Sequence, residues 1–225
     1  MAQKGASALA VKFYMKGYKN LKKELNNLKK APQTVLNRTI KDAKERAPAW
    51  VAAEVAKQYG IKKKEVGDGK TSKLKVEGDS VDSVELIYSG RVLTPTHFNM
   101  TPKAPREGAY TLKAEIIKGE KKTLGKVKKL TKKQRAALAK NFRREGTQSS
   151  NHSPIMLMRT GNQRVDGTSY IPFQRKSTNR KDVKAVKGPS VPQMIDSERT
   201  APNITKAINE NLGKRLDHHM KLLEK

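Results

Sequence analysis

The sequence predicts an α+β fold: N-terminal helices and a long C-terminal helix that pack on a small, mainly antiparallel β-sheet. Two observations support this fold class. Apolar residues recur every three or four positions near both ends of the chain, which is the period of a helix with one buried face. In the middle they alternate with polar residues, which is the period of a half-buried strand. Strands that follow a run of helices indicate an α+β architecture.

We expect one domain over residues 1–225, with two appended features. The first is a basic helical or loop insertion over residues 118–153. The second is the C-terminal helix over residues 199–225, where apolar side chains recur at every fourth position from Ile204 to Met220. The length of 225 residues suits a single domain with appendages.

The N-terminal third predicts helices that are separated by prolines. Over residues 18–28 a tyrosine and three leucines recur at helical spacing between charged residues. Pro32 suits the first position of a second helix, where a missing N–H group costs nothing. Pro48 is expected to kink or restart this helix, because it removes an amide that would bond back one turn. Gly60 suits a left-handed cap at its end.

The middle of the chain predicts short strands. Residues 72–76 and 81–88 alternate apolar with polar side chains, and Glu77-Gly78-Asp79-Ser80 between them has turn composition. These segments therefore predict a β-hairpin. Further strands are expected at residues 110–116, 155–159 and 170–175.

The composition is strongly basic and contains no cysteine. Lys and Arg number 49 against 21 Asp and Glu, which gives a formal net charge of +28. Such a charge indicates a partner that is nucleic acid, an anionic membrane or an acidic protein surface. Without cysteine there are no disulfides and no thiolate metal sites. No segment is apolar enough for a signal peptide or a membrane span, so we expect a soluble protein that is made inside a cell and has no membrane partner.

No group of residues predicts catalysis, a cofactor or a metal. The four histidines lack zinc-ligand spacing, and the adjacent His218 and His219 diverge by about 100 degrees on a helix. Most acids stand beside lysines, which is typical of ion pairs on solvated helix faces. Gly67-Asp68-Gly69-Lys70 resembles a phosphate-binding loop but lacks its spacing, and we interpret it as a turn. We therefore expect a protein that is not an enzyme and uses no cofactor.

The most basic stretch covers residues 118–144, with twelve Lys or Arg and one acid, Glu120. Its second half, residues 130–144, has helix-forming composition. Phe142 is its one aromatic residue, so base stacking and direct base recognition are not expected. Three interpretations stay open: a solvated basic arm, a contact with an acidic neighbouring subunit, and a non-specific contact with DNA. The candidate contact residues are Lys126, Lys128, Lys129, Lys132, Lys133, Arg135, Arg143 and Arg144.

Several segments, in a fixed order, resemble a known family. Residues 59–66 read Tyr-Gly-Ile-Lys-Lys-Lys-Glu-Val, residues 90–98 read Gly-Arg-Val-Leu-Thr-Pro-Thr-His-Phe, and residues 187–194 read Lys-Gly-Pro-Ser-Val-Pro-Gln-Met. Together with a leucine-striped N-terminal helix, a helix that contains Asn-Arg-Thr-Ile at residues 37–40 and a closing helix, they resemble the prophage minor tail protein Z family. This family is related to the tail-completion and head–tail neck proteins of long-tailed phages. The resemblance spans about Gly17 to Leu223, and Gly-Pro-Ser-Val-Pro-Gln-Met is its most specific element.

The resemblance implies a structural virion protein, assembled in the host bacterial cytoplasm, that completes the head-proximal end of a tail so that it can join a head. It also implies a ring, hexameric to match a six-fold tail. The implied partners are the tail terminator, tail tube or head–tail connector proteins, and packaged DNA held non-specifically in the channel. No catalytic residues are associated with the family. The basic insertion is longer than the family pattern leads us to expect.

The two proline-containing segments are the candidate interface. Pro189 and Pro192 fix backbone angles and predict a stiff bracket before the last helix. Phe98 beside a proline is typical either of a side chain that fills the core or of an interface anchor. The candidate interface residues are Thr94, Pro95, His97, Phe98, Pro189, Val191, Pro192 and Met194. The alternative function is a non-specific nucleic-acid-binding protein, associated with the nucleoid or the ribosome.

Overall fold

The computed structural model of the chain describes residues 6–12, 32–78, 84–127, 155–159, 170–175 and 182–224. Helices and antiparallel sheets in these residues confirm the α+β fold class. The single domain that we expected is divided into two compact units. The first unit contains residues 1–58, 62–92 and 189–225, and the second contains residues 59–61 and 93–188. The chain therefore enters the second unit twice, briefly at residues 59–61 and again over residues 93–188, and returns to the first unit each time.

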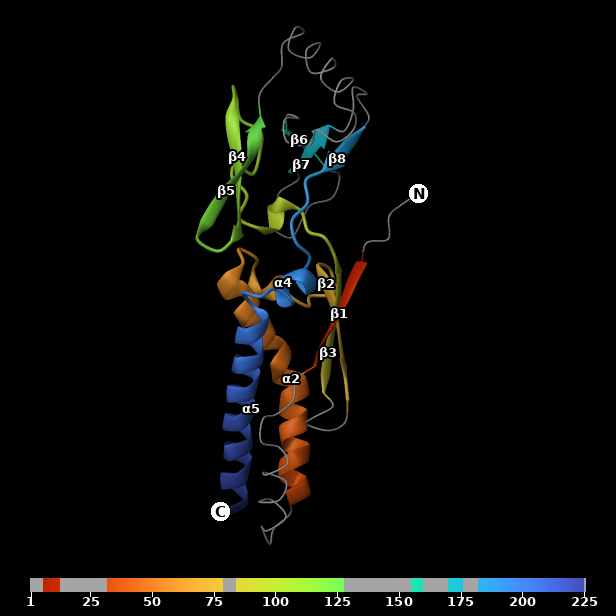
Figure 1. The fold of residues 1–225 in the computed structure, drawn as a ribbon, viewed down its shortest axis with the longest axis vertical. Coiled ribbons are helices and arrows are strands. Elements are labelled where there is room, and N and C mark those ends of the chain that lie inside the picture. Colours follow the sequence, from red (N-terminus) through yellow and green to blue (C-terminus); the bar gives the residue numbers. More distant parts are fainter. Residues whose placement is uncertain are drawn as a thin grey trace. The chain divides into compact units, whose positions relative to one another are not determined.

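The first unit contains a three-stranded antiparallel sheet with the order β1–β3–β2 (Figure 1). The strands are β1 (Ala6–Lys12), β2 (Ser72–Glu77) and β3 (Glu85–Arg91). The β2–β3 pair confirms the expected hairpin, and Gly78 adopts a positive φ of 96° where β2 ends. The edge strand β1 was not foreseen, and its backbone pairs with β3 from Ala6 to Lys12.

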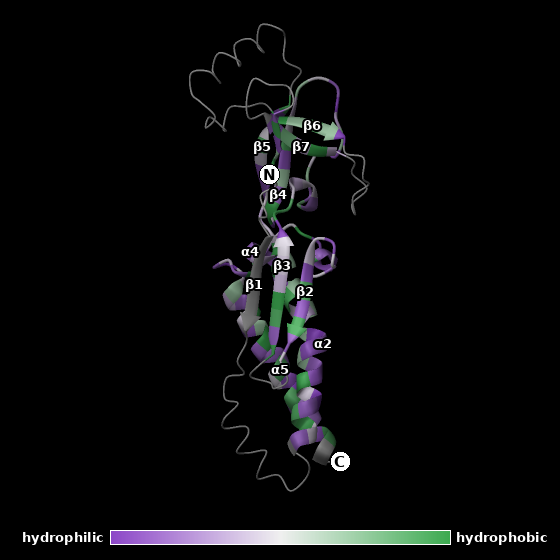
Figure 2. Cartoon of the chain, turned by 90° about the vertical axis from the view of Figure 1, so that its right-hand side faces the viewer, coloured by the Kyte–Doolittle hydropathy of each residue, from purple (hydrophilic) through white to green (hydrophobic). Residues whose placement is uncertain are grey.

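Among the described residues, three α-helices accompany this sheet: α2 (Pro32–Gln58), α4 (Val191–Ile195) and α5 (Ala201–Glu224). They lie on one side of the sheet (Figure 1), and Figure 2 views the sheet from the other side with the helices behind it. The buried residues of α2 recur every three or four positions, and Leu86 and Tyr88 on β3 are buried as well. Helices α2 and α5 pack along each other. The buried stripe of α5 is Ile204, Ile208, Leu212 and Leu216, as the sequence predicted.

Of the two outcomes expected at Pro48, a kink or a restart, the structure excludes the restart. The helix begins at Pro32 as expected and continues through Pro48 to Gln58. The neighbours of Pro48 on the buried face, Ala47 and Val51, are both 0% exposed. Tertiary burial of this face stabilises the helix against the one backbone bond that proline removes.

Gly60 is not a left-handed cap, since it is absent from the residues with positive φ. A glycine is needed there for a different reason. A Cβ atom on Gly60 would lie 2.0 Å from the carbonyl oxygen of Glu115, and the N–H of Gly60 donates to the Ile116 carbonyl at 3.1 Å. Close approach of two backbones, rather than a turn, selects the residue.

The described part of the second unit contains two small antiparallel sheets. Strands β4 (Tyr110–Ile117) and β5 (Glu120–Val127) form a hairpin, and β6 (Ile155–Arg159), β7 (Tyr170–Arg175) and β8 (Val183–Ala185) form a three-stranded sheet. The expected strands at residues 155–159 and 170–175 are confirmed, and they pair with each other. A small core of Met100, Leu112 and Ile155 packs with Leu124, Val127, Leu157 and Val186.

Strand β5 was predicted only as part of a basic stretch. Its exposed positions carry three lysines, a glutamate and a threonine, and its apolar content is low, so the period of its burial is not visible in the sequence. The helices expected at residues 18–28 and 130–144 lie outside the described residues. Within the described part, no helix is both long and apolar enough to cross a membrane.

Candidate functional site

The segment Thr94–Phe98 forms a single tight turn in the second unit, η2 (Pro95–His97). The N–H of His97 donates to the Thr94 carbonyl at 3.1 Å, and the N–H of Phe98 donates to the Pro95 carbonyl at 3.0 Å. The hydroxyls of Thr94 and Thr96 are 2.7 Å apart. Phe98 is 0% exposed, so the structure favours the interpretation in which its ring fills the core.

Gly188 brings the two proline-containing segments of the sequence together. Its N–H donates to the Leu93 carbonyl at 2.7 Å, and a Cβ atom on it would lie 2.9 Å from Cε2 of Phe98. The missing side chain of Gly188 therefore leaves space for the ring of Phe98. This contact lies wholly within the second unit.

Ser190 begins α4 in the first unit by means of a capping box. Its hydroxyl accepts from the N–H of Gln193 at 3.4 Å, and its own N–H donates to the Gln193 Oε1 at 2.9 Å. This pair of bonds satisfies donors that a helix start leaves open. The short helix then contacts β1, β3 and α2.

Most residues of the candidate interface are buried, so the prediction that they form an interface is corrected. Pro95, Phe98, Val191, Pro192 and Met194 are buried, because η2 and the capped turn of α4 direct them into the core. The partly exposed members of the set are Thr94, His97 and Pro189. The two segments therefore maintain the fold, and their apolar side chains are not available as contact anchors.

Asp42 is the centre of a charged cluster that links α2 to α5. Its Oδ1 accepts from Arg46 Nε at 2.9 Å, and its Oδ2 accepts from Arg215 Nε at 2.5 Å and lies 2.8 Å from His219 Nε2. Asp42 and His219 are 8% and 7% exposed. Burial alone would raise the pKa of Asp42, but hydrogen bonds from Arg215, His219 and Arg46 outweigh it and lower the pKa to about 2.

This cluster was missed in the sequence. The neighbour of His219 in the chain, His218, gives no indication of it, whereas Arg215 stands one turn earlier at the edge of the apolar stripe. Such i, i+4 spacing places Arg215 and His219 on the same face of α5, as it does Asp42 and Arg46 on α2. The spacing of charged residues on one helix can be recognised as part of an ionic cluster only when the helix that packs against it is known.

The cluster does not have the composition of an active site. Asp42 remains ionised and both of its oxygens accept hydrogen bonds, so it is not a free base. His219 Nδ1 is buried and has no hydrogen-bond partner among the described residues, so no nucleophilic hydroxyl is positioned next to it. No three potential ligands come together as a metal site in the part of the chain that the structure describes. The geometry indicates an ionic link between two helices.

The loop that resembled a phosphate-binding loop already contains an anion of its own. The Asp68 Oδ1 accepts from the N–H groups of Lys70 and Thr71 at 2.9 and 2.6 Å, and its Oδ2 accepts from the Thr71 hydroxyl at 3.1 Å. Gly67 and Gly69 adopt positive φ values of 81° and 77°. The donors that would hold a phosphate are therefore used by Asp68, and the interpretation as a turn is confirmed.

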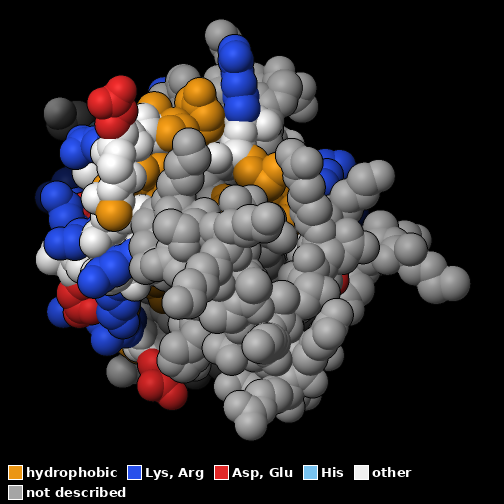
Figure 3. Space-filling view, turned by 90° about the horizontal axis from the view of Figure 1, so that it is seen from above, with side chains coloured by type: hydrophobic (Ala, Val, Ile, Leu, Met, Phe, Trp, Pro, Cys, Tyr) orange, Lys and Arg blue, Asp and Glu red, His pale blue; other side chains and the backbone are white. Residues whose placement is uncertain are grey.

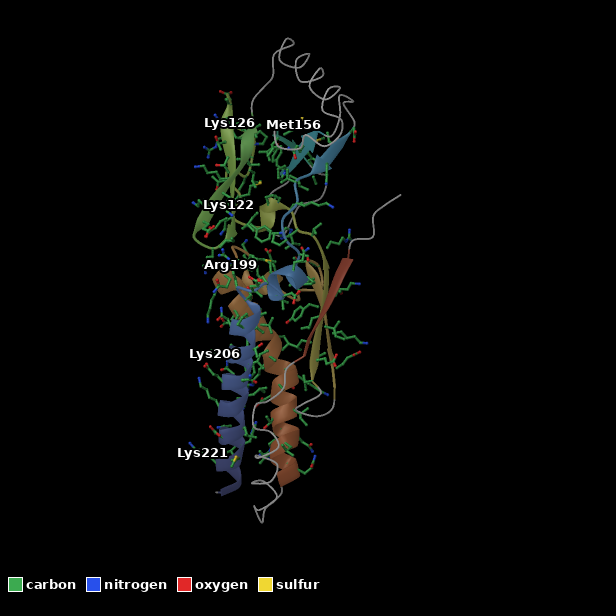
Figure 4. The ribbon with its side chains drawn as sticks, viewed as in Figure 1. Lys122, Lys126, Met156, Arg199, Lys206 and Lys221 are labelled. Carbon is green, nitrogen blue, oxygen red and sulfur yellow. The ribbon has the colours of Figure 1, made fainter. Side chains whose placement is uncertain are left out.

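Of the candidate basic contacts, Lys126 lies on β5 and is exposed. The other seven, Lys128, Lys129, Lys132, Lys133, Arg135, Arg143 and Arg144, lie outside the described residues. Lys122 and Lys126 both lie along β5 (Figure 4). Seen from above, Lys and Arg side chains are frequent along the left-hand edge of the molecule, with a few acidic side chains among them (Figure 3).

The chain was compared with known proteins by family, by sequence and by structure. No family model, curated protein or solved structure matches it.

Proposed function

We propose that this chain is a structural, non-catalytic virion protein that completes the head-proximal end of a bacteriophage tail. The observation that carries the proposal is the position of segments that resemble the minor tail protein Z family: they lie where the chain passes from one unit to the other. The chain crosses between its two units next to residues 58–62, 92–93 and 188–189. Three of the segments that carry the resemblance, residues 59–66, 90–98 and 187–194, each span one of these crossings.

Residues in the segments that span these crossings have structural roles. Gly60 and Gly188 permit close backbone or ring approaches, and Ser190 starts a helix. The part of the resemblance that lies at these crossings therefore concerns residues that maintain the fold, which suits a family without catalytic residues. Two polar groupings in the described residues invited a chemical interpretation, the Asp42 cluster and the Asp68 loop. In both, the carboxylate is already bonded to groups of the chain itself.

A ring of copies is part of this proposal. The described sheet of the first unit ends in two edge strands, β1 and β2, whose outer backbone groups pair with no other described strand. Sheet edges are places at which another chain can add. A head-to-tail contact of this kind closes into a ring when the rotation between copies closes.

The direct test uses the phage or lysogen that encodes the chain. Particles labelled with an antibody against the full chain should show the label at the junction of head and tail in electron micrographs. The purified chain should form closed oligomers in light scattering, and these should sediment with isolated tails. A chain that stays monomeric, does not bind tails and leaves the neck unlabelled would overturn the proposal.

A further inference from the structure

The β4–β5 hairpin carries lysines on its outward face. Buried Leu112 and Ala114 point to the core side of β4, so Lys113 between them points away from it. Lys113 is paired with Thr123 on β5, and directly paired residues share a face. Lys121, two positions from Thr123, therefore lies on this same outward face.

Lys126 joins this face through a second pair. It is opposite Thr111, which is two positions from Lys113 and shares its side of the sheet. A register shift after Leu112 makes this possible, because the extra residue on β5 brings Lys126 to the outward side. Lys113, Lys121 and Lys126 are all exposed, and we call them the hairpin lysines.

Glu115 is the acid at an outward position of β4, and its carboxylate is already engaged. Its Oε1 accepts from the N–H of Gly119 at 2.7 Å, and its Oε2 accepts from the Asn99 amide at 3.2 Å. These two bonds lower the pKa of Glu115, and the charges of Lys121 and Lys118 lower it further. The nearness of Lys121 to Glu115 agrees with the shared face, and lysines remain in excess on it.

The surroundings of the hairpin lysines distinguish between two kinds of anionic partner. Protein interfaces have an apolar centre and are depleted in lysine. The large exposed hydrophobic residues of the described chain are Met158 and Leu222, and neither lies on β4 or β5. The outward positions that the register defines carry Lys, Thr and Glu, with no aromatic residue on which an unpaired base could stack. A face with exposed lysines, but with no apolar centre and no aromatic residue for base stacking, suits the phosphates of duplex DNA.

We propose that the outward face of the β4–β5 hairpin, through Lys113, Lys121 and Lys126, binds the phosphate backbone of duplex DNA without sequence preference. This inference goes beyond the tail role and does not depend on it, because a chain that is absent from tails would still bind DNA by this face.

Helix α5 provides the matched control, because its exposed lysines alternate with acids. Lys206 lies 3.9 Å from Glu210, and Asp217 stands three and four positions from Lys214 and Lys221. Residues three or four apart are neighbours on a helix, so each lysine has an acid beside it. Lys206 and Lys221 lie along α5 in Figure 4. Removal of these three lysines changes the net charge as much as removal of the hairpin lysines does.

The experiment measures binding of the full-length chain to a labelled duplex of about 20 base pairs while the salt concentration is raised from about 50 to 200 mM. Log affinity should fall linearly with log salt. The triple variant K113Q/K121Q/K126Q should bind more weakly to every sequence. Its salt slope should be smaller by about three, since each phosphate that is no longer neutralised lowers the slope by about one. The control K206Q/K214Q/K221Q should keep a slope close to that of the unchanged chain. K113R/K121R/K126R, which keeps the charge, should restore both affinity and slope.

Three results would overturn the proposal. One is an equal loss in the hairpin and α5 variants, since only overall charge would then matter. Another is an unchanged slope in the hairpin variant, which would assign DNA binding to other basic residues. The third is binding to polyglutamate but not to DNA, which would identify an acidic protein as the partner. Thermal unfolding of each variant should match that of the unchanged chain. If the triple glutamine variant unfolds, the single variants K113Q, K121Q and K126Q make the same test, and each should lower the slope by about one.

Discussion

The two units of this protein use charge in opposite ways. In the first unit, Asp42, Arg46, Arg215 and His219 form a cluster that joins two helices, and the exposed lysines of α5 have acids within one turn. In the second unit, the β4–β5 hairpin presents lysines outward around one engaged carboxylate. Charge that is satisfied within the chain stabilises the fold, whereas charge that is left in excess is available to a partner. The net charge of +28 therefore does not describe one uniform surface.

The largest expected effect follows from removing the carboxylate at the centre of the Asp42 cluster. Asp42→Ala leaves Arg215 and His219 partly or fully buried without their anion. Loss of one partner of a buried pair costs about 3–5 kcal/mol, and we expect about 2–4 kcal/mol because Arg46 is largely exposed. Urea unfolding measures the loss. Glu45→Ala, which removes an exposed acid 4.0 Å from Lys41, should cost less than about 1 kcal/mol. Equal effects of the two substitutions would contradict the contrast between satisfied and exposed charge.

A second substitution tests packing rather than charge in the second unit. Gly60→Ala places a Cβ atom 2.0 Å from the Glu115 carbonyl oxygen, and backbone atoms must move to admit it. We expect destabilisation by up to about 3 kcal/mol in thermal or urea unfolding. Gly213→Ala is the control, because no atom lies within 4 Å of its added methyl group. It lies within helix α5 and should stabilise the chain by about 0.5–1 kcal/mol. A Gly60→Ala variant with unchanged stability would show that the backbone of β4 does not pack tightly against residue 60.

The Asp42 cluster also predicts a dependence of stability on pH. The pKa of Asp42 is about 2 in the folded chain, below its ordinary value of 3.8, so the unfolded chain binds more protons between these values. Stability from this group is therefore fully present above about pH 4 and is lost as the pH falls towards 2, by on the order of 2 kcal/mol. Unfolding free energies measured at several acidic pH values should be flatter for Asp42→Asn than for the unchanged chain. Parallel curves for the two proteins would contradict the assigned pKa.

The smallest of these effects concerns the start of α4. Ser190→Ala removes the hydroxyl that accepts from Gln193 and should cost about 1 kcal/mol in urea unfolding. Gln193→Ala removes the reciprocal bond to the Ser190 N–H. Because the two bonds form one capping box, the double variant should lose less than the sum of the single losses. Strict additivity would show that the two bonds act independently.

Much of the secondary structure follows from local pattern. Strands β6 and β7 lie where alternation predicted them, and α2 begins at the proline that suits a first helical position. Periodicity does not identify β5, because a strand that is rich in exposed lysines and has few apolar residues resembles any basic segment. Gly60 was assigned a turn because a glycine after a helix is typical of one, and the actual constraint comes from a strand far away in the sequence.

The candidate site was predicted less well than the fold. The apolar residues around Pro95 and Pro192 were expected at an interface, but burial is a property of the assembled chain that a five-residue motif does not reveal. The Asp42 cluster joins residues more than 170 positions apart. Its charges become a single feature only when α2 and α5 lie side by side.

The sequence by itself determined the α+β class, the closing amphipathic helix, the β2–β3 hairpin and the excess of positive charge. These depend on periods of two and 3.6 residues and on composition, both of which are local. The tertiary structure alone decided that the chain forms two units, that residues 59–66, 90–98 and 187–194 span the crossings between them, and which charges are paired within the chain. Satisfaction of a charge depends on what lies within a few ångströms in space, and only folding brings distant partners to that distance.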